Sequence, residues 1–318
     1  NTLPRSRRSL IYVPGSDQRK LAKSATLDVD VVCLDLEDGV ALNRKAIARQ
    51  QVTTALQRLD FGQAERVVRL NGLGSPYIQD DLDATLAGHP DAYVLPKVEQ
   101  AQDLIWLSAQ LDRAETERGW TPGSIRILAI IETPAGVTNL AHIVAASPRL
   151  DALLFGAMDF SASLGITDRY APALLYARSA IVTHAVAHHL QALDMVCETV
   201  WDRRALRREV QDSAAMGFTG KQLIHPGHVA LTQQQFTPSP EAIAAAQDIV
   251  QTFQAHQQDG KGAYALNGKM IDMPVYKAAL QVLAKAGVAA KAATQPQTGS
   301  ELPGETPRPW WQRFGMQG

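Results

Sequence analysis

The sequence lacks a strong excess of either charge. Its 318 residues include 31 Lys and Arg and 32 Asp and Glu, which gives a formal net charge of −1. A chain with so little net positive charge gains no counterion-release drive toward nucleic acid. The sequence also lacks any apolar run of about 18 residues, the length that a membrane-spanning helix needs. We therefore expect neither a nucleic-acid partner nor a membrane partner.

Cysteine is scarce as well, and the two that occur, Cys33 and Cys197, lie inside apolar, strand-like runs. Two such thiols do not make the disulfide framework of a small secreted domain, so we expect a reducing, cytoplasmic setting and two buried thiols. Basic residues precede the apolar run Leu10–Val13. That run of about four residues is too short for the core of a signal peptide. The composition, 46% hydrophobic and 20% charged, predicts a globular protein with ample material for a core.

What the sequence does contain is an alternation of short β-branched runs with longer helical patterns. This alternation predicts a parallel sheet with crossover helices, in the α/β class. The runs that predict strands are Ser9–Val13, Val29–Leu36, Arg66–Leu70, Ala92–Pro96, Arg126–Ile131, Ala152–Phe155, Met195–Val200 and Gly220–Ile224. The helices expected between them include Ala41–Leu59, Asp80–Ala87, Gln100–Glu115, Pro172–Leu193 and Asp202–Met216. Eight β/α units in roughly 230 residues favour a closed (β/α)₈ TIM barrel over an open doubly wound sheet.

Beyond Pro226 the alternation stops. We expect the barrel to span residues 1–230 and a C-terminal helix–hairpin–helix extension to span 231–292. Its helices are predicted at Pro240–Gln257 and Met273–Ala286, with a type I′ hairpin turn at Asn267 and Gly268. The polar tail at 293–318 is predicted to be disordered.

Several of the predicted strands are apolar along their length and become polar only near their carboxyl ends. In a parallel barrel these ends converge on one face, where the active sites of this fold lie. The polar residues near these ends are Asp35, Glu37, Asp38, Arg69, Asn71, Lys97, Glu99, Glu132, Asp159, Glu198, Asp202 and His225.

Glu132 and Asp159 follow two neighbouring predicted strands, so their carboxylates are expected to lie close together. Two like charges in a mostly apolar mouth are costly unless a cation lies between them. Oxygen-only ligation with room for water and substrate favours Mg²⁺, because zinc prefers His or Cys. The alternative is that each acid caps a following helix or pairs with Arg or Lys.

Arg69 ends the apolar run RVVRL, where its planar guanidinium suits a carboxylate or an enolate oxygen. A salt bridge to Glu37 or Asp38 across the mouth is the alternative, and both roles can hold at once. Glu37 and Asp38 are also candidates for orienting Arg69 or a metal-bound water.

Gly156, Ala157 and Met158 lie just before Asp159 and are candidate substrate contacts. The two small residues let the backbone approach a ligand, so that its amides can donate to a bound carboxylate. Turn geometry alone explains the same pattern.

The first predicted strand leads into VPGSDQRKLAK. Pro14, Gly15, Arg19 and Lys20 are candidates for holding a phosphate at the start of the next helix. An ordinary helix cap with a solvated basic face is the alternative.

Lys97 is the lysine whose place near a strand end allows a Schiff-base role, but the surrounding acids favour a charged structural role. His184 and His188 have the i, i+4 spacing of metal ligands, yet no third ligand accompanies them, so a packing or solvated role is expected. For His225 a loop-stabilising role and substrate contact are both open. Asp272, among apolar neighbours and before Pro274, predicts either a proton-transfer group or a helix N-cap.

Eight motifs in order resemble one family: RSLIYVPGS, VVCLDLEDGV, RVVRLN, VLPKVE, IIETPAG, FGAMDF, GFTGKQLIHP and GKMIDMP. Together they are similar to the citrate lyase β-subunit-like branch of the HpcH/HpaI aldolase superfamily, close to the stand-alone citramalyl-CoA and malyl-CoA lyases. The resemblance covers most of residues 7–285.

The resemblance implies a (β/α)₈ barrel that binds Mg²⁺ through Glu132 and Asp159. It implies that Arg69 contacts the substrate carboxylate or the developing enolate, and that coenzyme A phosphates lie near Gly15, Arg19 and Lys20. It also implies that Asp272 reaches the active site of a neighbouring subunit on a C-terminal lid, in a homotrimer or hexamer.

The function so implied is Mg²⁺-dependent cleavage or formation of a β-hydroxyacyl-CoA, with acetyl-CoA and a 2-keto acid as the partners. Alternatives are a CoA-independent 2-keto-acid aldolase and a citrate lyase subunit that is active only with partner subunits. The late MIDMP segment favours a stand-alone CoA enzyme. Which acyl group is used, and whether cleavage, condensation or thioester hydrolysis dominates, does not follow from the sequence.

Overall fold

The protein is described by a computed structural model, which places residues 5–167, 172–258, 262–266 and 268–286. The chain divides into two compact units, Asn1–Thr237 and Pro238–Gly318. No helix in the described part of the chain combines the length and the apolar character that crossing a bilayer requires.

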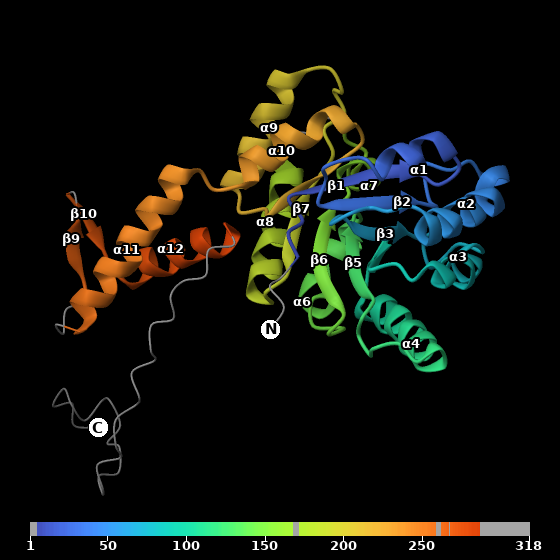
Figure 1. Ribbon diagram of the computed structural model, residues 1–318, viewed down its shortest axis with the longest axis horizontal. Helices are drawn as coiled ribbons and strands as arrows, with labels where there is room; N and C mark the ends of the chain where they lie inside the picture. The colour runs from blue at the N-terminus through green and yellow to red at the C-terminus, as the bar shows by residue number, and fades with distance from the viewer. Residues whose placement is uncertain (1–4, 168–171, 259–261, 267, 287–318) are drawn as a thin grey trace, which may run out of the picture. The chain divides into compact units, whose positions relative to one another are not determined.

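The first unit is a closed barrel of eight parallel strands, as predicted (Figure 1). Each strand pairs with the next along the chain, and β1 pairs with β8 to close the circle. The strands are β1 (Ser9–Pro14), β2 (Val31–Asp35), β3 (Glu65–Arg69), β4 (Ala92–Leu95), β5 (Arg126–Ile131), β6 (Leu150–Phe155), β7 (Gln191–Asp194) and β8 (Gly220–Leu223).

Helices follow the strands and cover the outside of the barrel. The longest, α4, ends in a left-handed Gly119, which is the usual helix-ending position for glycine. The α-helices of this unit are α1 (Gln18–Ser24), α2 (Lys45–Arg58), α3 (Ile78–Thr85), α4 (Ala101–Arg118), α5 (Pro134–Thr138), α6 (Leu140–Ile143), α7 (Ala157–Leu164), α8 (Pro172–Ala187), α9 (Arg203–Ala215) and α10 (Val229–Phe236). Short 3₁₀ turns are η1 (Leu42–Arg44), η2 (Leu86–Gly88) and η3 (Pro226–His228).

The predicted position of the seventh strand was wrong. The expected helix ends at Ala187 rather than Leu193, and the strand is Gln191–Asp194 rather than Met195–Val200. The helix ends without glycine or proline, because His189 takes the left-handed conformation with φ of 58°. The residues with high β-propensity in MVCETV therefore lie in the loop after the strand. Cys197 in that loop and Cys33 in β2 are both buried, as predicted.

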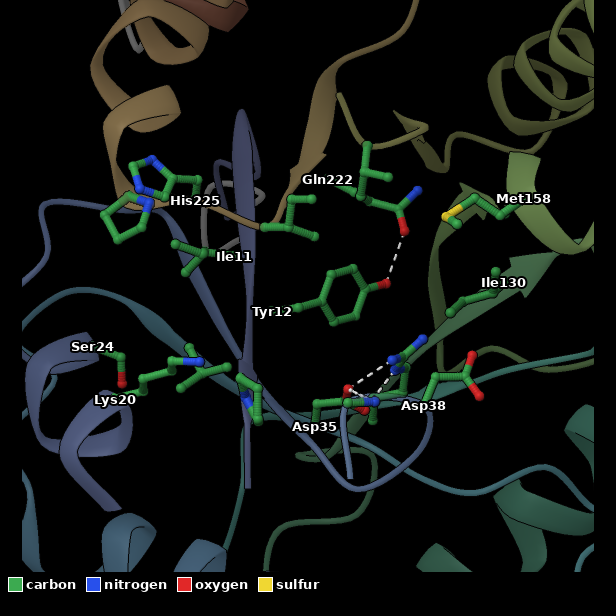
Figure 2. Close-up of a pocket in the computed structure, with 18 of the residues that line it drawn as sticks. Ile11, Tyr12, Lys20, Ser24, Asp35, Asp38, Ile130, Met158, Gln222 and His225 are labelled. Atoms are coloured by element: carbon green, nitrogen blue, oxygen red, sulfur yellow. Dashed lines mark hydrogen bonds and ion pairs between the residues drawn. The ribbon is translucent and has the colours of Figure 1, made fainter. Parts of the chain in front are cut away.

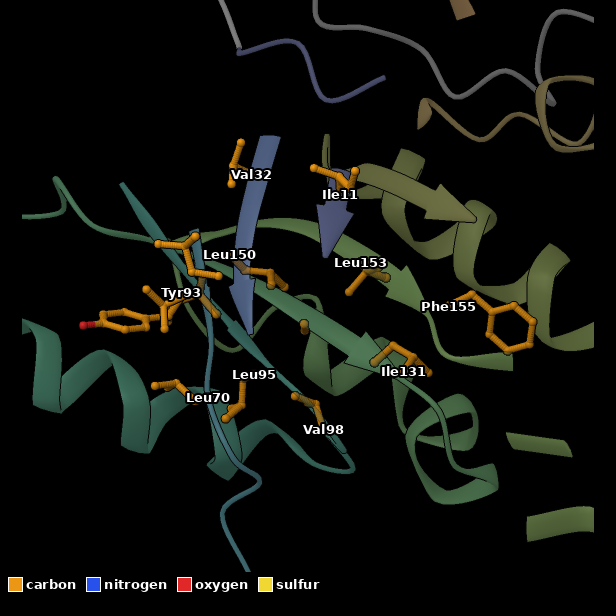
Figure 3. Packing of buried hydrophobic residues seen from close by; sticks show 14 of the residues in the cluster. Ile11, Val32, Leu70, Tyr93, Leu95, Val98, Ile131, Leu150, Leu153 and Phe155 are labelled. Atoms are coloured by element: carbon orange, nitrogen blue, oxygen red, sulfur yellow. The ribbon is translucent and has the colours of Figure 1, made fainter. Parts of the chain in front are cut away.

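Alternation along the strands divides the core into two layers. Inward residues such as Val31, Cys33 and Val67 fill the barrel interior with other small and branched side chains. Outward residues such as Val32 and Leu95 pack against the helices in a larger outer layer (Figure 3). Burial of each such side chain stabilises the fold by about 1.5–3 kcal/mol. The filled interior makes the barrel a scaffold whose chemistry is confined to its ends.

The second unit has the predicted helix–hairpin–helix order: α11 (Pro240–Gln258), β9 (Tyr264–Leu266), β10 (Lys269–Ile271) and α12 (Met273–Lys285). Its small core joins the two helices through Ala246, Val250, Ala279 and Leu283. The hairpin register pairs Leu266 with Lys269, and Gly268 has φ of 76°. Asn267 and the tail predicted at 293–318 lie outside the described residues.

Candidate active site

The carboxyl ends of the strands surround a cavity of about 790 Å³ (Figure 2). Its lining comes from the ends of β1, β2, β3 and β8 and from the segments after β5 and β6. Of the twelve polar side chains predicted to converge on one face, six line this cavity: Asp35, Asp38, Arg69, Glu132, Asp159 and His225.

Glu132 directly follows β5 and is only 4% exposed. Its Oε1 accepts a hydrogen bond of 2.8 Å from the backbone N–H of Lys97. Burial raises the pKa of this carboxyl to about 8, and the negative charges of Glu37 and Asp159 add to the rise. At neutral pH the Glu132 carboxyl therefore keeps a proton unless a cation comes to it.

Asp159 lies in the first turn of α7, whose N-cap is Gly156, rather than at the end of β6 itself. It lines the same cavity as Glu132 and is close enough for its charge to raise the Glu132 pKa. A β-carbon at position 156 would lie 2.4 Å from both the β-carbon and Oε2 of Glu132. Glycine at 156 thus allows close approach of the Glu132 side chain, whereas the sequence suggested close approach of a ligand.

These two acids fit a hard cation better than a soft one. Within the described ranges, no group of three or more His, Cys, Asp or Glu is arranged to hold a metal. A two-carboxylate site suits Mg²⁺, which takes one or two protein carboxylates and fills its remaining positions with water and substrate oxygens. Burial and the nearby charges of Glu37 and Asp159 raise the pKa of Glu132, and a bound cation would offset both effects.

Arg69 is held on several sides at once. Its Nε and Nη2 donate to the two carboxylate oxygens of Asp35 at 2.7 Å each, and its Nη1 lies 3.0 Å from Glu37 Oε2. The guanidinium carbon is 4.6 Å from the centre of the Tyr12 ring. The predicted salt bridge to Glu37 is present, but the principal partner is Asp35 rather than Asp38.

Sequence reasoning did not assign Asp35 to Arg69, although strand alternation carries the signal. Val31, Cys33 and Asp35 share the inward face of β2, and Val67 and Arg69 share that of β3. The register pairs Asp35 directly with Arg69. Side chains opposite each other on one face are neighbours, so the fork between them follows from alternation and register together.

Glu37 and Lys97 form a second, partly buried contact beside Arg69. Lys97 Nζ donates to Glu37 Oε1 at 2.8 Å, and 46% of the Lys97 side chain is exposed. Burial lowers the Lys97 pKa, but the hydrogen bond and charge of Glu37 outweigh it and raise the pKa overall. A lysine held charged in this way is a poor Schiff-base nucleophile, as the sequence suggested. Burial raises the pKa of Glu37, against the opposing charge of Arg69.

The turn that carries Glu37 and Asp38 is fixed from behind by a buried lysine. Lys45 Nζ donates to the carbonyl oxygens of Leu36 and Glu37 and to Asn71 Oδ1, at 2.6–2.7 Å. Asp35 also accepts from the backbone N–H groups of Glu37 and Gly39. Asp38 remains exposed at the cavity rim.

The predicted phosphate site at α1 is only partly reproduced. The Gly15 amide donates to the Asp35 carbonyl at 2.8 Å, and Asp17 caps the helix by accepting from Lys20 N–H. An acidic N-cap disfavours an anion at these amides. Pro14 and Lys20 line the cavity together with Lys23, which the sequence analysis missed; Arg19 does not contribute to the lining.

The other candidates have structural partners. His225 lines the cavity while its Nδ1 accepts from Gly227 N–H, so it stabilises its loop as one of the two predictions held. His184 Nδ1 lies 2.9 Å from the Ala180 carbonyl oxygen within α8. Ala157 and Met158 line the cavity, and Met158 is 62% exposed.

Asp272 is the N-cap of α12, where Oδ1 accepts from Val275 N–H at 3.3 Å. The N-cap prediction is therefore confirmed. Because Asp272 belongs to the second unit, its proton-transfer role remains a prediction.

Comparison with known proteins gives a consistent family. Residues 8–226 match the family described as HpcH/HpaI aldolase/citrate lyase. The chain is 40% identical over 288 residues to the mitochondrial citramalyl-CoA lyase of Homo sapiens, covering 86% of this chain and 83% of that protein. It is 36% identical to the citrate lyase subunit beta of Escherichia coli strain K12, covering 89% of this chain and 94% of that protein.

A solved structure agrees with these relatives. The protein CitE from Mycobacterium tuberculosis, in complex with magnesium, acetoacetate and coenzyme A, superposes with a TM-score of 0.72 at 30% sequence identity. The similarity covers 89% of this chain and 98% of that one.

Proposed function

The chain belongs to the HpcH/HpaI aldolase/citrate lyase family, and on that premise we propose that it is a Mg²⁺-dependent carbon–carbon lyase. Its substrate would be a β-hydroxyacyl-CoA such as citramalyl-CoA, malyl-CoA or a citryl thioester. Cleavage would give acetyl-CoA and a 2-keto acid, and condensation would run the same step in reverse.

The observation that carries this proposal is the pair Glu132 and Asp159 on one cavity. Burial, reinforced by the negative charges of Glu37 and Asp159, raises the pKa of Glu132 to about 8. Those two residues would hold the Mg²⁺ ion, which when bound supplies a Lewis acid that polarises the oxygen of the forming keto group.

Arg69 would bind the substrate carboxylate or the oxygen that gains charge. A guanidinium has five N–H donors. Asp35 accepts from two of them, on Nε and Nη2, while Nη1 lies 3.0 Å from Glu37 Oε2 as an ion pair. The others remain for a substrate oxygen, and the fixed guanidinium needs no reorganisation when charge develops. Lys97 would keep Glu37 in place through its 2.8 Å hydrogen bond.

The bond change is a reverse Claisen-type cleavage. The β-hydroxyl group gives up its proton, the carbon–carbon bond breaks, and its electron pair passes to the acetyl-CoA enolate. A proton then returns to the enolate carbon, and Asp272 is our candidate to exchange it. In the proposed homotrimer or hexamer, Asp272 of a neighbouring copy would supply this group to the cavity.

The thioester arm would extend toward Lys20 and Lys23 of α1, which line the cavity. The CitE complex with coenzyme A supports a CoA ligand in this family. The cytoplasmic location stays a prediction, since the human relative is named mitochondrial.

The test is an incubation of the purified chain with citramalyl-, malyl- and citryl-CoA, each with Mg²⁺ and with EDTA. We expect acetyl-CoA and a keto acid from at least one thioester with Mg²⁺ only. Cleavage of free hydroxy keto acids instead would favour the CoA-independent aldolase. Inactivity of the isolated chain, recovered on adding citrate lyase partner subunits, would favour the complex subunit.

In the same assay an Asp272→Asn variant separates the two roles of Asp272. Asparagine caps a helix as well as aspartate does, so α12 should keep its stability while the proton-transfer group is lost. The turnover rate should fall, while the affinity for Mn²⁺, used as a substitute for Mg²⁺, should stay unchanged. A wild-type turnover rate would show that Asp272 has no part in the mechanism.

A further inference from the structure

We propose that Tyr12 and Gln222 are positioning residues that fix the guanidinium of Arg69 and tie it to the segment carrying Asp159. The inference rests on the proposed function, because it assigns Arg69 a substrate oxygen to bind. Neither residue was among the candidates that the sequence suggested.

Tyr12 forms the face on which Arg69 rests. The guanidinium carbon lies 4.6 Å from the ring centre, within the range of a cation–π interaction. The fork to Asp35 fixes one edge of the guanidinium plane, and the ring fixes its tilt. Two constraints in different directions leave Arg69 little rotational freedom.

Gln222 fixes Tyr12 in turn. The Tyr12 hydroxyl donates to Gln222 Oε1 at 2.8 Å, a contact visible in Figure 2. Gln222 is 3% exposed, and its Nε2 donates to the carbonyl oxygens of Phe155 and Asp194 at 2.9 and 3.1 Å. Because both amide hydrogens are used, the side-chain oxygen must face Tyr12, and the direction of the hydroxyl is set.

The carbonyl of Phe155 connects this chain of contacts to the metal side of the cavity. Phe155 ends β6, and Gly156 after it lies directly against Glu132. Glu132 accepts from the Lys97 amide, and Lys97 and Arg69 both contact Glu37.

The contacts therefore close into a ring around the mouth of the barrel. Beginning and ending at Arg69, they pass through Tyr12, Gln222, Phe155, Gly156, Glu132, Lys97 and Glu37. A shift of the segment before Asp159 would reach Arg69 through Gln222 and Tyr12.

The experiment measures the affinity of the purified full-length protein, loaded with Mn²⁺, for pyruvate, glyoxylate and oxaloacetate by calorimetry. Tyr12→Phe keeps the ring and removes the hydroxyl, so we expect the dissociation constant to rise roughly two- to tenfold, the effect of one hydrogen bond. Tyr12→Leu removes the ring and should raise it by about ten- to thirtyfold, as expected for a desolvated cation–π contact. In steady-state cleavage, KM should change more than kcat.

Coupling between the two residues is tested with Gln222→Met. If the hydroxyl acts through Gln222, the double variant Tyr12→Phe, Gln222→Met should bind no more weakly than Gln222→Met alone. If Gln222→Met does not fold, the keto-acid affinities of Tyr12→Phe and Tyr12→Leu still test whether Tyr12 positions Arg69.

Tyr93→Phe is the matched control, because Tyr93 has a buried hydroxyl 2.9 Å from Thr85 Oγ1 in the outer layer, away from the cavity. It should lower stability without changing keto-acid affinity. Equal affinities for wild type, Tyr12→Phe and Tyr12→Leu would overturn the proposal. A wild-type protein that binds no keto acid and cleaves no thioester would instead refute the proposed function.

Discussion

Glu115 and Glu132 are buried glutamates near the two ends of the same strand, β5, and their environments are opposite. Glu115 is 1% exposed and Glu132 is 4% exposed. Burial acts to raise the pKa of both. At Glu115 it is outweighed by hydrogen bonds from Arg149 and from the N–H groups of Ile125 and Gly123, which lower the pKa to about 2. At Glu132 burial is reinforced by neighbouring acids, and the pKa rises to about 8.

The contrast extends to the two ends of the barrel. At the amino ends of the strands, each of four acids has an arginine partner: Arg7 with Glu65, Arg8 with Asp30, Arg66 with Asp91 and Arg126 with Asp151. At the carboxyl ends, Glu132 and Asp159 share a cavity, and the neighbouring Arg69 and Lys97 are already paired with Asp35 and Glu37. Satisfied charge stabilises one end, and unsatisfied charge at the other leaves a place for a ligand.

The largest effect expected from this contrast is on activity. Glu132→Gln removes one of the two carboxylates available to a metal, so kcat/KM for thioester cleavage should fall by about a hundred- to a thousandfold. Mn²⁺ affinity, measured by calorimetry, should fall with it. Glu115→Gln is the control, and its kcat/KM should match that of wild type. A wild-type kcat/KM in the Glu132→Gln variant would show that the Glu132–Asp159 pair is not needed for catalysis.

Next in size is a loss of stability at the other end. Glu115→Gln leaves the Arg149 guanidinium without its buried anionic partner, so the free energy of unfolding should fall by about 2–3 kcal/mol. Chemical denaturation at pH 7 measures this. Because the folded pKa of Glu115 is lowered to about 2, its contribution is present above pH 4.5 and is lost as the pH falls toward 2. An unchanged unfolding midpoint at pH 7 would contradict the assignment.

The smallest effect has the opposite sign. Without metal, Glu132→Gln should increase the free energy of unfolding at pH 7 by about 1–2 kcal/mol, because an amide does not titrate and so avoids the cost of the raised pKa. Desolvation of the buried amide limits the gain. The folded pKa of Glu132 is raised to about 8 from an unfolded value near 4.5, so between these values the folded carboxyl stays protonated while the unfolded one ionises. The resulting destabilisation is absent below pH 4.5 and grows as the pH rises toward 8. Denaturation in EDTA at pH 4.5 and 7.5 tests whether the gain appears only at the higher pH. A variant less stable than wild type at both pH values would show that the Glu132 carboxyl does not destabilise the folded protein.

Most of the barrel could be predicted from the sequence, because apolar runs and helical patterns repeat in order around it. The exception was β7, where a helix ends at a left-handed histidine that no local pattern announces. For the site, convergence of Glu132, Asp159 and Arg69 followed from the fold. The partners of these residues could not be predicted, because contacts such as Lys97 with Glu37 join residues far apart in the chain. Gln222 gave no signal because it is a single polar residue in a short strand.

The packed interior of the barrel has a consequence for the order of events. The interior cluster, from Leu10 through Leu193, is buried, so the barrel interior gives no passage from the cavity, whose lining includes Tyr12 and Ile130. Under the proposed function the keto acid occupies this inner end beside Arg69, while the thioester extends outward past Lys20, whose side chain is 64% exposed. In this arrangement the outer molecule would lie across the exit of the inner one. We therefore expect acetyl-CoA to depart first and the keto acid second, and in the reverse direction the keto acid to arrive before its partner.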